Sequence, residues 1–101
     1  MENKTASQVT QLQSEGNKLL VCYTATWCNV CKLLIPRLDT ISTNYPSVKF
    51  VQVDVDQNKE LVNSLNIQTV PTVMIYNGTT LINRSLGSNV DSVYTKLLDT
   101  L

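Results

Sequence analysis

Two cysteines separated by two residues, Cys28 and Cys31, are the side chains of this sequence with the clearest chemical potential. They follow a short apolar run and open a segment with helical periodicity. If Cys28 lies in the turn that leaves a strand and Cys31 lies one helical turn further on, their sulfurs are close enough to form a bond. The first thiol then lies at a helix N-terminus, where unpaired backbone N–H groups and the helix dipole favour a thiolate. Because the thiolate is the nucleophile of disulfide exchange, the spacing predicts that Cys28 attacks and that Cys31 resolves the mixed disulfide.

A pair of cysteines with this spacing is also half of many zinc sites. The sequence contains no histidine, so only Cys22 and scattered carboxylates remain as further ligands. We therefore favour redox chemistry and expect neither a metal ion nor an organic cofactor. The third cysteine, Cys22, is interpreted as a small buried hydrophobic residue, with a part in disulfide exchange as the alternative.

Length, charge and cysteine usage exclude several classes of function. The 101 residues are expected to form a single domain over 1–101. Eight basic and eight acidic side chains give a formal net charge of zero without a run of either sign, so neither nucleic acid nor a membrane surface is an expected partner. Residues 1–8 lack the apolar stretch of a secretory signal, and no apolar run approaches the roughly 20 residues that span a bilayer. Three cysteines with one close pair differ from a secreted disulfide scaffold, and we expect a soluble cytoplasmic protein.

The periodicity of apolar residues predicts helices and strands in the order αβαβαββα. The apolar run at 19–23 is expected to be a central strand, and the Val-rich segment at 50–56 a second strand parallel to it. The expected helices cover 4 to about 15, 29 to about 45, 58–65 and about 90–101, and the expected strands cover 19–23, 50–56, 73–76 and 81–86.

Local signals place the ends of these elements. Thr5 and Gln8 have the spacing of a capping box, and Gly16 is a plausible stop for the first helix. Pro36 lies inside the second helix and predicts a bend there. Asn77 and Gly78 together predict a hairpin. The last helix is expected to begin at a cap on Ser88 or Asn89 and to place Val90 on its buried face.

Taken together, these landmarks resemble the thioredoxin family over nearly the whole chain. The resemblance implies an α/β thioredoxin fold, in which helices flank a central mixed sheet. It rests on Ala25-Thr26-Trp27-Cys28 with Cys31-Lys32, Pro36, Val53-Asp54-Val55-Asp56, Val70-Pro71-Thr72, Asn77-Gly78 and Gly87.

The resemblance also implies an activity and a site. Family members are protein dithiol–disulfide oxidoreductases that serve electron transport and cell redox homeostasis by reducing disulfide-containing proteins. A thioredoxin-reductase-like enzyme or another dithiol restores them, and a monomer is the expected state. By the same resemblance Pro71 is expected in the cis form, packed against the cysteines. The residues expected to border a groove for the substrate are Trp27, Asn29, Val30, Val70, Pro71 and Gly87.

Three departures from the family pattern carry predictions of their own. Asn29-Val30 stands where thioredoxins usually have Gly-Pro, which predicts a more stable thiolate and a more oxidising couple. Cys22 replaces a buried Asp and Gln52 replaces the Lys that often accompanies it, so the expected proton acceptor for the resolving thiol is missing. We treat Cys22, Gln52 and Lys32 as modulating residues.

The third departure concerns the N-terminus, where little sequence precedes the first helix. We therefore expect about four strands, without the first edge strand of ordinary thioredoxins, and residues 48–55 at an edge of the sheet. Two other functions stay open at this point. A raised redox potential would indicate a thiol oxidase or disulfide isomerase, and dispensable cysteines would indicate a binding subunit of a larger assembly.

Overall fold

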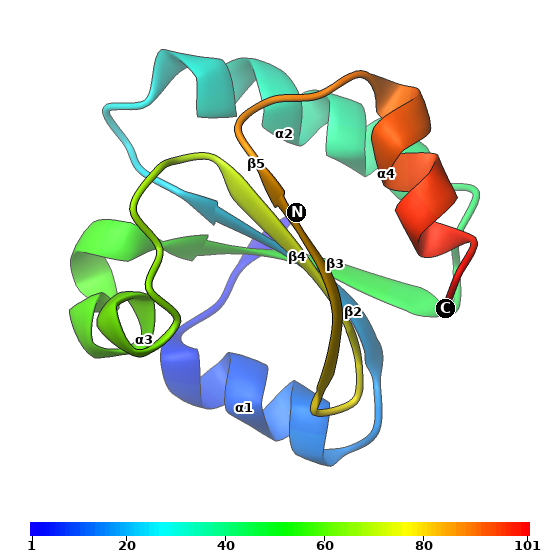
Figure 1. The fold of residues 1–101 in the computed structure, drawn as a ribbon, viewed down its shortest axis with the longest axis horizontal. Coiled ribbons are helices and arrows are strands. Elements are labelled where there is room, and N and C mark those ends of the chain that lie inside the picture. The colour runs from blue at the N-terminus through cyan, green and yellow to red at the C-terminus, as the bar shows by residue number, and fades with distance from the viewer.

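The computed structural model of the protein describes all residues from 1 to 101 and contains one five-stranded sheet with helices on both faces (Figure 1). Helices α2 and α4 cover one face, and α1 and α3 cover the other. None of the helices has the length and apolar character needed to cross a membrane. The elements are β1 (Glu2–Asn3), α1 (Ala6–Ser14), β2 (Lys18–Thr24), α2 (Asn29–Ser42), β3 (Val48–Asp54), a 3₁₀ turn (Val55–Gln57), α3 (Lys59–Ser64), β4 (Thr72–Asn77), β5 (Thr80–Leu86) and α4 (Asp91–Leu98).

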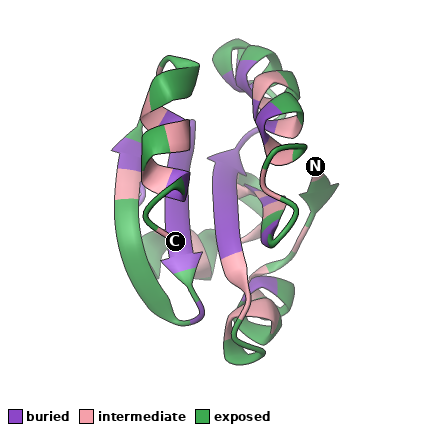
Figure 2. Ribbon diagram, turned by 90° about the vertical axis from the view of Figure 1, so that its right-hand side faces the viewer, coloured by how far each residue is buried: buried purple, intermediate pink, exposed green.

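The sheet is mixed, as expected, and its strands lie in the order β1-β3-β2-β4-β5. Strand β3 runs parallel to β2, whereas β4 runs antiparallel to β2 and forms a hairpin with β5. Strand β2 lies at the centre and is buried from Leu19 to Thr24, which confirms the prediction for this apolar run (Figure 2). The two cysteines follow shortly after its C-terminal end.

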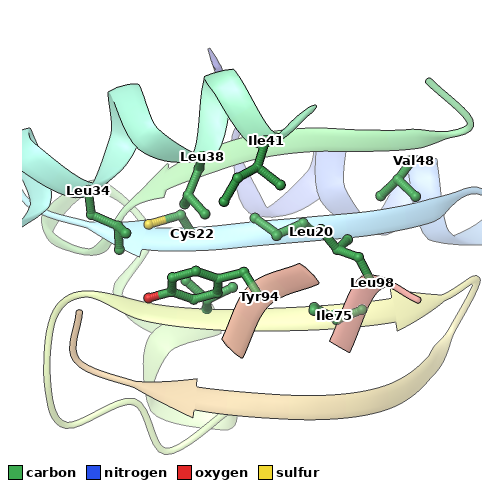
Figure 3. Packing of buried hydrophobic residues seen from close by; sticks show 10 residues of the cluster. Leu20, Cys22, Leu34, Leu38, Ile41, Val48, Ile75, Tyr94 and Leu98 are labelled. Atoms are coloured by element: carbon green, nitrogen blue, oxygen red, sulfur yellow. The ribbon is translucent and has the colours of Figure 1, made fainter. Parts of the chain in front are cut away.

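Alternation along the strands divides the buried side chains between the two faces of the sheet. Leu20 and Cys22 of β2 pack beneath α2 and α4. Figure 3 shows them with Leu34 and Leu38 of α2 and Leu98 of α4. Leu19, Val21 and Tyr23 pack on the opposite face against α1 and α3. Each face is therefore closed by two helices, and the strands between them form a rigid support for the loops at their ends.

The capping signals of the first helix are confirmed. Thr5 is the N-cap of α1: its hydroxyl accepts the backbone N–H of Gln8 at 3.3 Å, and its own N–H donates to the Gln8 side chain at 2.9 Å. The helix ends at Ser14, and Gly16 adopts a left-handed conformation at φ +81°. Helix α2 continues through Pro36 to Ser42, so the proline does not end it.

The expectation of four strands is wrong, because residues Glu2 and Asn3 form a short strand parallel to β3. Backbone bonds hold this strand, among them the bond from the N–H of Lys4 to the carbonyl oxygen of Gln52 at 2.8 Å. The Gln52 side chain adds a second bond, since its amide nitrogen donates to the carbonyl oxygen of Met1 at 2.9 Å. Two polar residues carry no alternating apolar pattern, which is why the sequence did not indicate them as a strand. As a result β3 lies between β1 and β2 rather than at an edge.

Two further boundaries differ from the prediction. Strand β3 ends at Asp54, whose carboxylate accepts the N–H of Asp56 at 2.8 Å and starts the 3₁₀ turn. The N-cap of α4 is Val90 instead of Ser88 or Asn89, and it makes no side-chain capping bond. Val90 is also 67% exposed, so its expected place on the buried face of this helix is wrong.

Candidate active site

The two cysteines form a disulfide bond at the N-terminus of α2. Cys28 is the N-cap of the helix, and its backbone N–H donates to the carbonyl oxygen of Ala25 at 3.1 Å, which forms the turn after β2. Its sulfur accepts the backbone N–H of Cys31 at 3.2 Å. Cys28 is 7% exposed, whereas Cys31 is completely buried. A partner can therefore reach only the sulfur of Cys28.

The segment around Pro71 lies against the Cys28 sulfur. The peptide bond between Val70 and Pro71 is cis, as expected, and the Val70 carbonyl oxygen lies 4.0 Å from the Cys28 sulfur. The backbone N–H of Gly87 donates to the Pro71 carbonyl oxygen at 2.8 Å. Gly87 has φ +72°, a value that a residue with a side chain rarely adopts, so the chain can turn there beside Pro71. The structure thus brings these three residues to the cysteines.

Trp27 borders the site on the side of β3. Its side chain is 65% exposed, and its indole N–H donates to the carboxylate of Asp56 at 2.8 Å. Sequence reasoning assigned Asp56 only to the end of a strand and the start of the following helix, and missed this contact. The available signal was topological, because the carboxyl ends of the parallel strands β2 and β3 meet at the same edge of the sheet. A groove of about 320 Å³ continues from the indole and is lined by Trp27, Val55, Val62, Ile67, Gln68, Thr69 and Val70.

We expect Asp56→Asn to weaken the hold on the indole, since a hydrogen bond to a charged group is lost. Trp27 is the only tryptophan, so its fluorescence anisotropy reports the change directly. Glu15→Gln, at the opposite end of β2 from the cysteines, is the charge-matched control. An unchanged anisotropy in the Asp56 variant would contradict this role.

The remaining residues predicted for the site fall into two groups. Asn29 and Val30 are exposed in the first turn of α2, beside the disulfide. Lys32 and Gln52 lie further back and help to line a small pocket of about 170 Å³ between α2 and β3. The amide of Gln52 donates to the carbonyl oxygen of Met1, directly before β1, and so helps to hold this strand.

Cys22 lies in the apolar layer between the sheet and α2. Figure 3 shows its sulfur directed toward Leu34 and Leu38 of α2. The residue is completely buried, and burial raises the pKa of its thiol to about 12. No Asp, Glu, Lys or Arg is among the buried residues, whose polar members are Thr24, Thr72 and Ser85. The layer beneath the cysteines therefore offers no buried carboxylate or amine to exchange a proton with Cys31.

The raised pKa of Cys22 predicts a pH dependence of stability. Above pH 9 the unfolded chain loses the thiol proton while the folded protein keeps it, so folding is favoured less as the pH rises toward 12. We expect wild type to lose about 1 kcal/mol relative to Cys22→Ala between pH 9 and pH 10. Urea unfolding of both proteins at each pH measures the difference. Parallel stability profiles would contradict the buried, protonated thiol.

Comparison with known proteins agrees with this site. The sequence profile of the thioredoxin family matches residues 2–99. The chain is 38% identical over 80 residues to thioredoxin Asp f 28 of Aspergillus fumigatus, covering 78% of this chain and 73% of that one. It is 30% identical over 87 residues to thioredoxin-2 of Saccharomyces cerevisiae, with 85% and 84% covered. The structure of Plasmodium falciparum thioredoxin superposes with a TM-score of 0.89 at 27% identity, covering 99% and 98% of the two chains.

A disulfide at the start of a helix, one sulfur reachable and the other buried, is the site of a thiol–disulfide oxidoreductase. With the matching profile and relatives, the fold places the chain in the thioredoxin family. The family resemblance drawn from the sequence is thereby confirmed.

Proposed function

We propose that this protein reduces disulfide bonds of partner proteins through the Cys28–Cys31 couple. The observation that carries the proposal is the difference between the two sulfurs: Cys28 is reachable at the helix N-terminus, whereas Cys31 is buried behind it. The N–H of Cys31 points at the Cys28 sulfur at 3.2 Å and stabilises a thiolate there in the reduced protein.

The reaction proceeds in two exchange steps. The Cys28 thiolate attacks one sulfur of the substrate disulfide, and the other substrate sulfur leaves as a thiolate. Cys31 then loses its proton and attacks the Cys28 sulfur, which releases the second substrate thiolate and forms the Cys28–Cys31 disulfide. Two electrons have passed to the substrate, whose two sulfurs leave as thiols once they take up protons.

The proton of Cys31 has no buried carboxylate to receive it. Cys22, with a pKa of about 12, stays protonated near neutral pH. Water that reaches the mouth of the site, or the departing substrate thiolate, is the acceptor that we propose. We therefore expect the second step to be slower near neutral pH than in a protein with an acid beneath the cysteines.

Replacing Asn29-Val30 by Gly-Pro is expected to lower the reduction potential. A proline in the first turn removes the backbone N–H at position 30 and stiffens the helix start, which disfavours the thiolate form relative to wild type. We expect a shift of about 30 mV, equivalent to tenfold in the exchange equilibrium. Equilibration of both proteins with glutathione mixtures measures it. A wild-type potential equal to or below that of the variant would refute the effect.

The same dipeptide favours a second candidate, a thiol oxidase or disulfide isomerase with a raised potential.

The test of the proposed reductase is to mix the reduced protein with disulfide-bonded insulin and count the thiols released. We expect two insulin thiols for each protein molecule oxidised, and none from a variant with both Cys28→Ser and Cys31→Ser. If the wild type released none either, the reductase proposal would fail; a raised reduction potential would then indicate the oxidase or isomerase, and a cysteine pair that forms no disulfide would indicate a binding subunit.

We further propose that the electron donor is a thioredoxin-reductase-like enzyme or another dithiol and that the protein acts as a monomer. A reducing compartment such as the cytoplasm suits a couple that must be returned to the dithiol form.

A further inference from the structure

Asp54, the last residue of β3, faces the side of the sheet that α2 covers. Val51 and Val53 pack on the opposite face, in the apolar layer beneath α1 and α3. Because side chains alternate along a strand, the side chain of Asp54 points toward α2. In the sheet Asp54 lies beside Thr24 of β2, two positions beyond Cys22. A carboxylate is therefore present on this face, nearer than Cys22 to the end of β2 that leads to the cysteines.

The small pocket of about 170 Å³ between α2 and β3 connects Asp54 with the surroundings of the cysteines. We call it the inner pocket. Ala25 lines this pocket and also packs in one cluster with Cys28 and Cys31. The other lining residues are Asn3, Thr24, Thr26, Lys32, Ile35, Gln52 and Asp54. Most of these side chains are polar, and the volume exceeds that of one water molecule several times, so the inner pocket can hold water.

Asp54 also borders a second hollow of about 340 Å³, which we call the outer hollow. Its lining is entirely polar and consists of Asn3, Lys4, Thr5, Thr26, Asp54, Gln57 and Asn58. One carboxylate oxygen of Asp54 accepts the backbone N–H of Asp56 at 2.8 Å, and Asp54 belongs to none of the ion pairs of the protein. Its second oxygen is therefore free to take up a proton on one side and release it on the other.

The charged groups around Asp54 leave it as the base of the inner pocket. Lys32 is the other charged side chain that lines this pocket, and an ammonium group cannot accept a proton. On the outer side, Lys4 is paired with Glu2 at 2.9 Å, and the carboxylate of Asp56 is bonded to the indole N–H of Trp27. The remaining polar groups of the inner pocket are hydroxyls and amides, which are far weaker bases than a carboxylate.

Resting on the proposed function, we propose that Asp54 is the base that receives the proton of Cys31 through water in the second exchange step. The thiol proton passes to water of the inner pocket, and that water passes a proton to the Asp54 carboxylate. The Cys31 thiolate then attacks the Cys28 sulfur, the bond between Cys28 and the substrate breaks, and the substrate sulfur leaves as a thiolate. Asp54 returns its proton to solvent through the outer hollow, which restores the carboxylate.

The test variant is Asp54→Asn, which removes the base but keeps the local structure. Asparagine caps a helical turn as well as aspartate does, and its amide oxygen can still accept the N–H of Asp56. Glu60→Gln is the control, since it removes an exposed carboxylate of α3 that lines neither the inner pocket nor the outer hollow.

The two exchange steps are followed separately in a single turnover. Reduced protein is mixed with a disulfide-linked peptide dimer at a concentration that makes the first step fast, and samples are quenched with acid. The first peptide thiol released reports the attack by Cys28, and the second reports resolution by Cys31. Mass spectrometry of the same samples measures the mixed disulfide between them.

We expect Asp54→Asn to release the first thiol at the wild-type rate and the second about tenfold more slowly at pH 6.5, a smaller loss than for a base in direct contact because water relays the proton. Glu60→Gln should match wild type in both steps. Added formate, a small carboxylate, should restore the second step of Asp54→Asn. Raising the pH to about 9 should also remove the difference, since hydroxide then takes the thiol proton directly.

Equal rates of the second step in wild type and Asp54→Asn at pH 6.5 would overturn the proposal. So would a slow second step that neither formate nor the higher pH restores, because a merely structural defect responds to neither. In both cases the disulfide chemistry stays intact. Failure of wild type to release any peptide thiol would instead refute the proposed function.

Discussion

Cys28→Ser is expected to lower the rate of disulfide reduction at least about a thousandfold, because it removes the only sulfur that a substrate can reach. Cys31→Ser is expected to have a different effect. Cys28 still attacks, but nothing displaces the substrate, so the protein accumulates as a covalent mixed disulfide. Non-reducing electrophoresis and mass spectrometry of the protein mixed with disulfide-bonded insulin distinguish the two variants.

The asymmetry between the two variants is the informative result. Cys22→Ser is the matched control and should reduce insulin at the wild-type rate, because its thiol stays protonated and takes no part in exchange. Trapped complexes in Cys28→Ser rather than in Cys31→Ser would reverse the assigned roles. Equal trapping in both would mean that either sulfur can reach a substrate, contrary to their different burial.

Cys22→Asp is expected to lower the free energy of unfolding by about 3 kcal/mol at pH 7, because it places a carboxylate in an apolar layer without a partner. The folded protein favours the neutral acid, which raises the carboxyl pKa above its value of about 4 in the unfolded chain. Stability is therefore highest below pH 4 and is lost as the pH rises through the raised value. Chemical unfolding between pH 4 and pH 8 measures this dependence.

The same variant tests the missing proton acceptor. An acid at position 22 lies in the layer beneath α2, where it can accept the proton of Cys31 and speed the second exchange step. Cys22→Asn is the control, since it has the same shape but cannot take a proton near neutral pH. An equal rate of mixed-disulfide resolution in the Asp and Asn variants would show that proton transfer does not limit the step.

Much of the fold could be predicted from the sequence because apolar periodicity and turn chemistry agree. The buried run in β2 and the capping box at Thr5 behave as their residue types predict. The short strand β1 could not be predicted, since backbone bonds to β3 and the amide of Gln52 hold it rather than any apolar pattern. Val90 was misplaced for a related reason: helical spacing predicts a buried face, but α4 begins only at Asp91, whose carboxylate accepts the distant Arg37 guanidinium at 2.9 Å.

The candidate site also contains features that could be predicted from the sequence and features that could not. The cysteine pair lies within one short motif, and the cis bond before Pro71 is implied by the family resemblance. The bond between Trp27 and Asp56 joins residues 29 positions apart. Contacts of this kind depend on how the loops at one edge of the sheet meet, which residue spacing alone does not encode.

The reduction potential of the Cys28–Cys31 couple tests the proposed reductase most directly. It is measured by equilibrating the protein with a series of glutathione mixtures and trapping the free thiols, with Cys22→Ala as the control for the third cysteine. We predict a value near or below the cytosolic glutathione poise, roughly −220 to −320 mV by the differing methods. A clearly higher potential would contradict the account and indicate a thiol oxidase or isomerase.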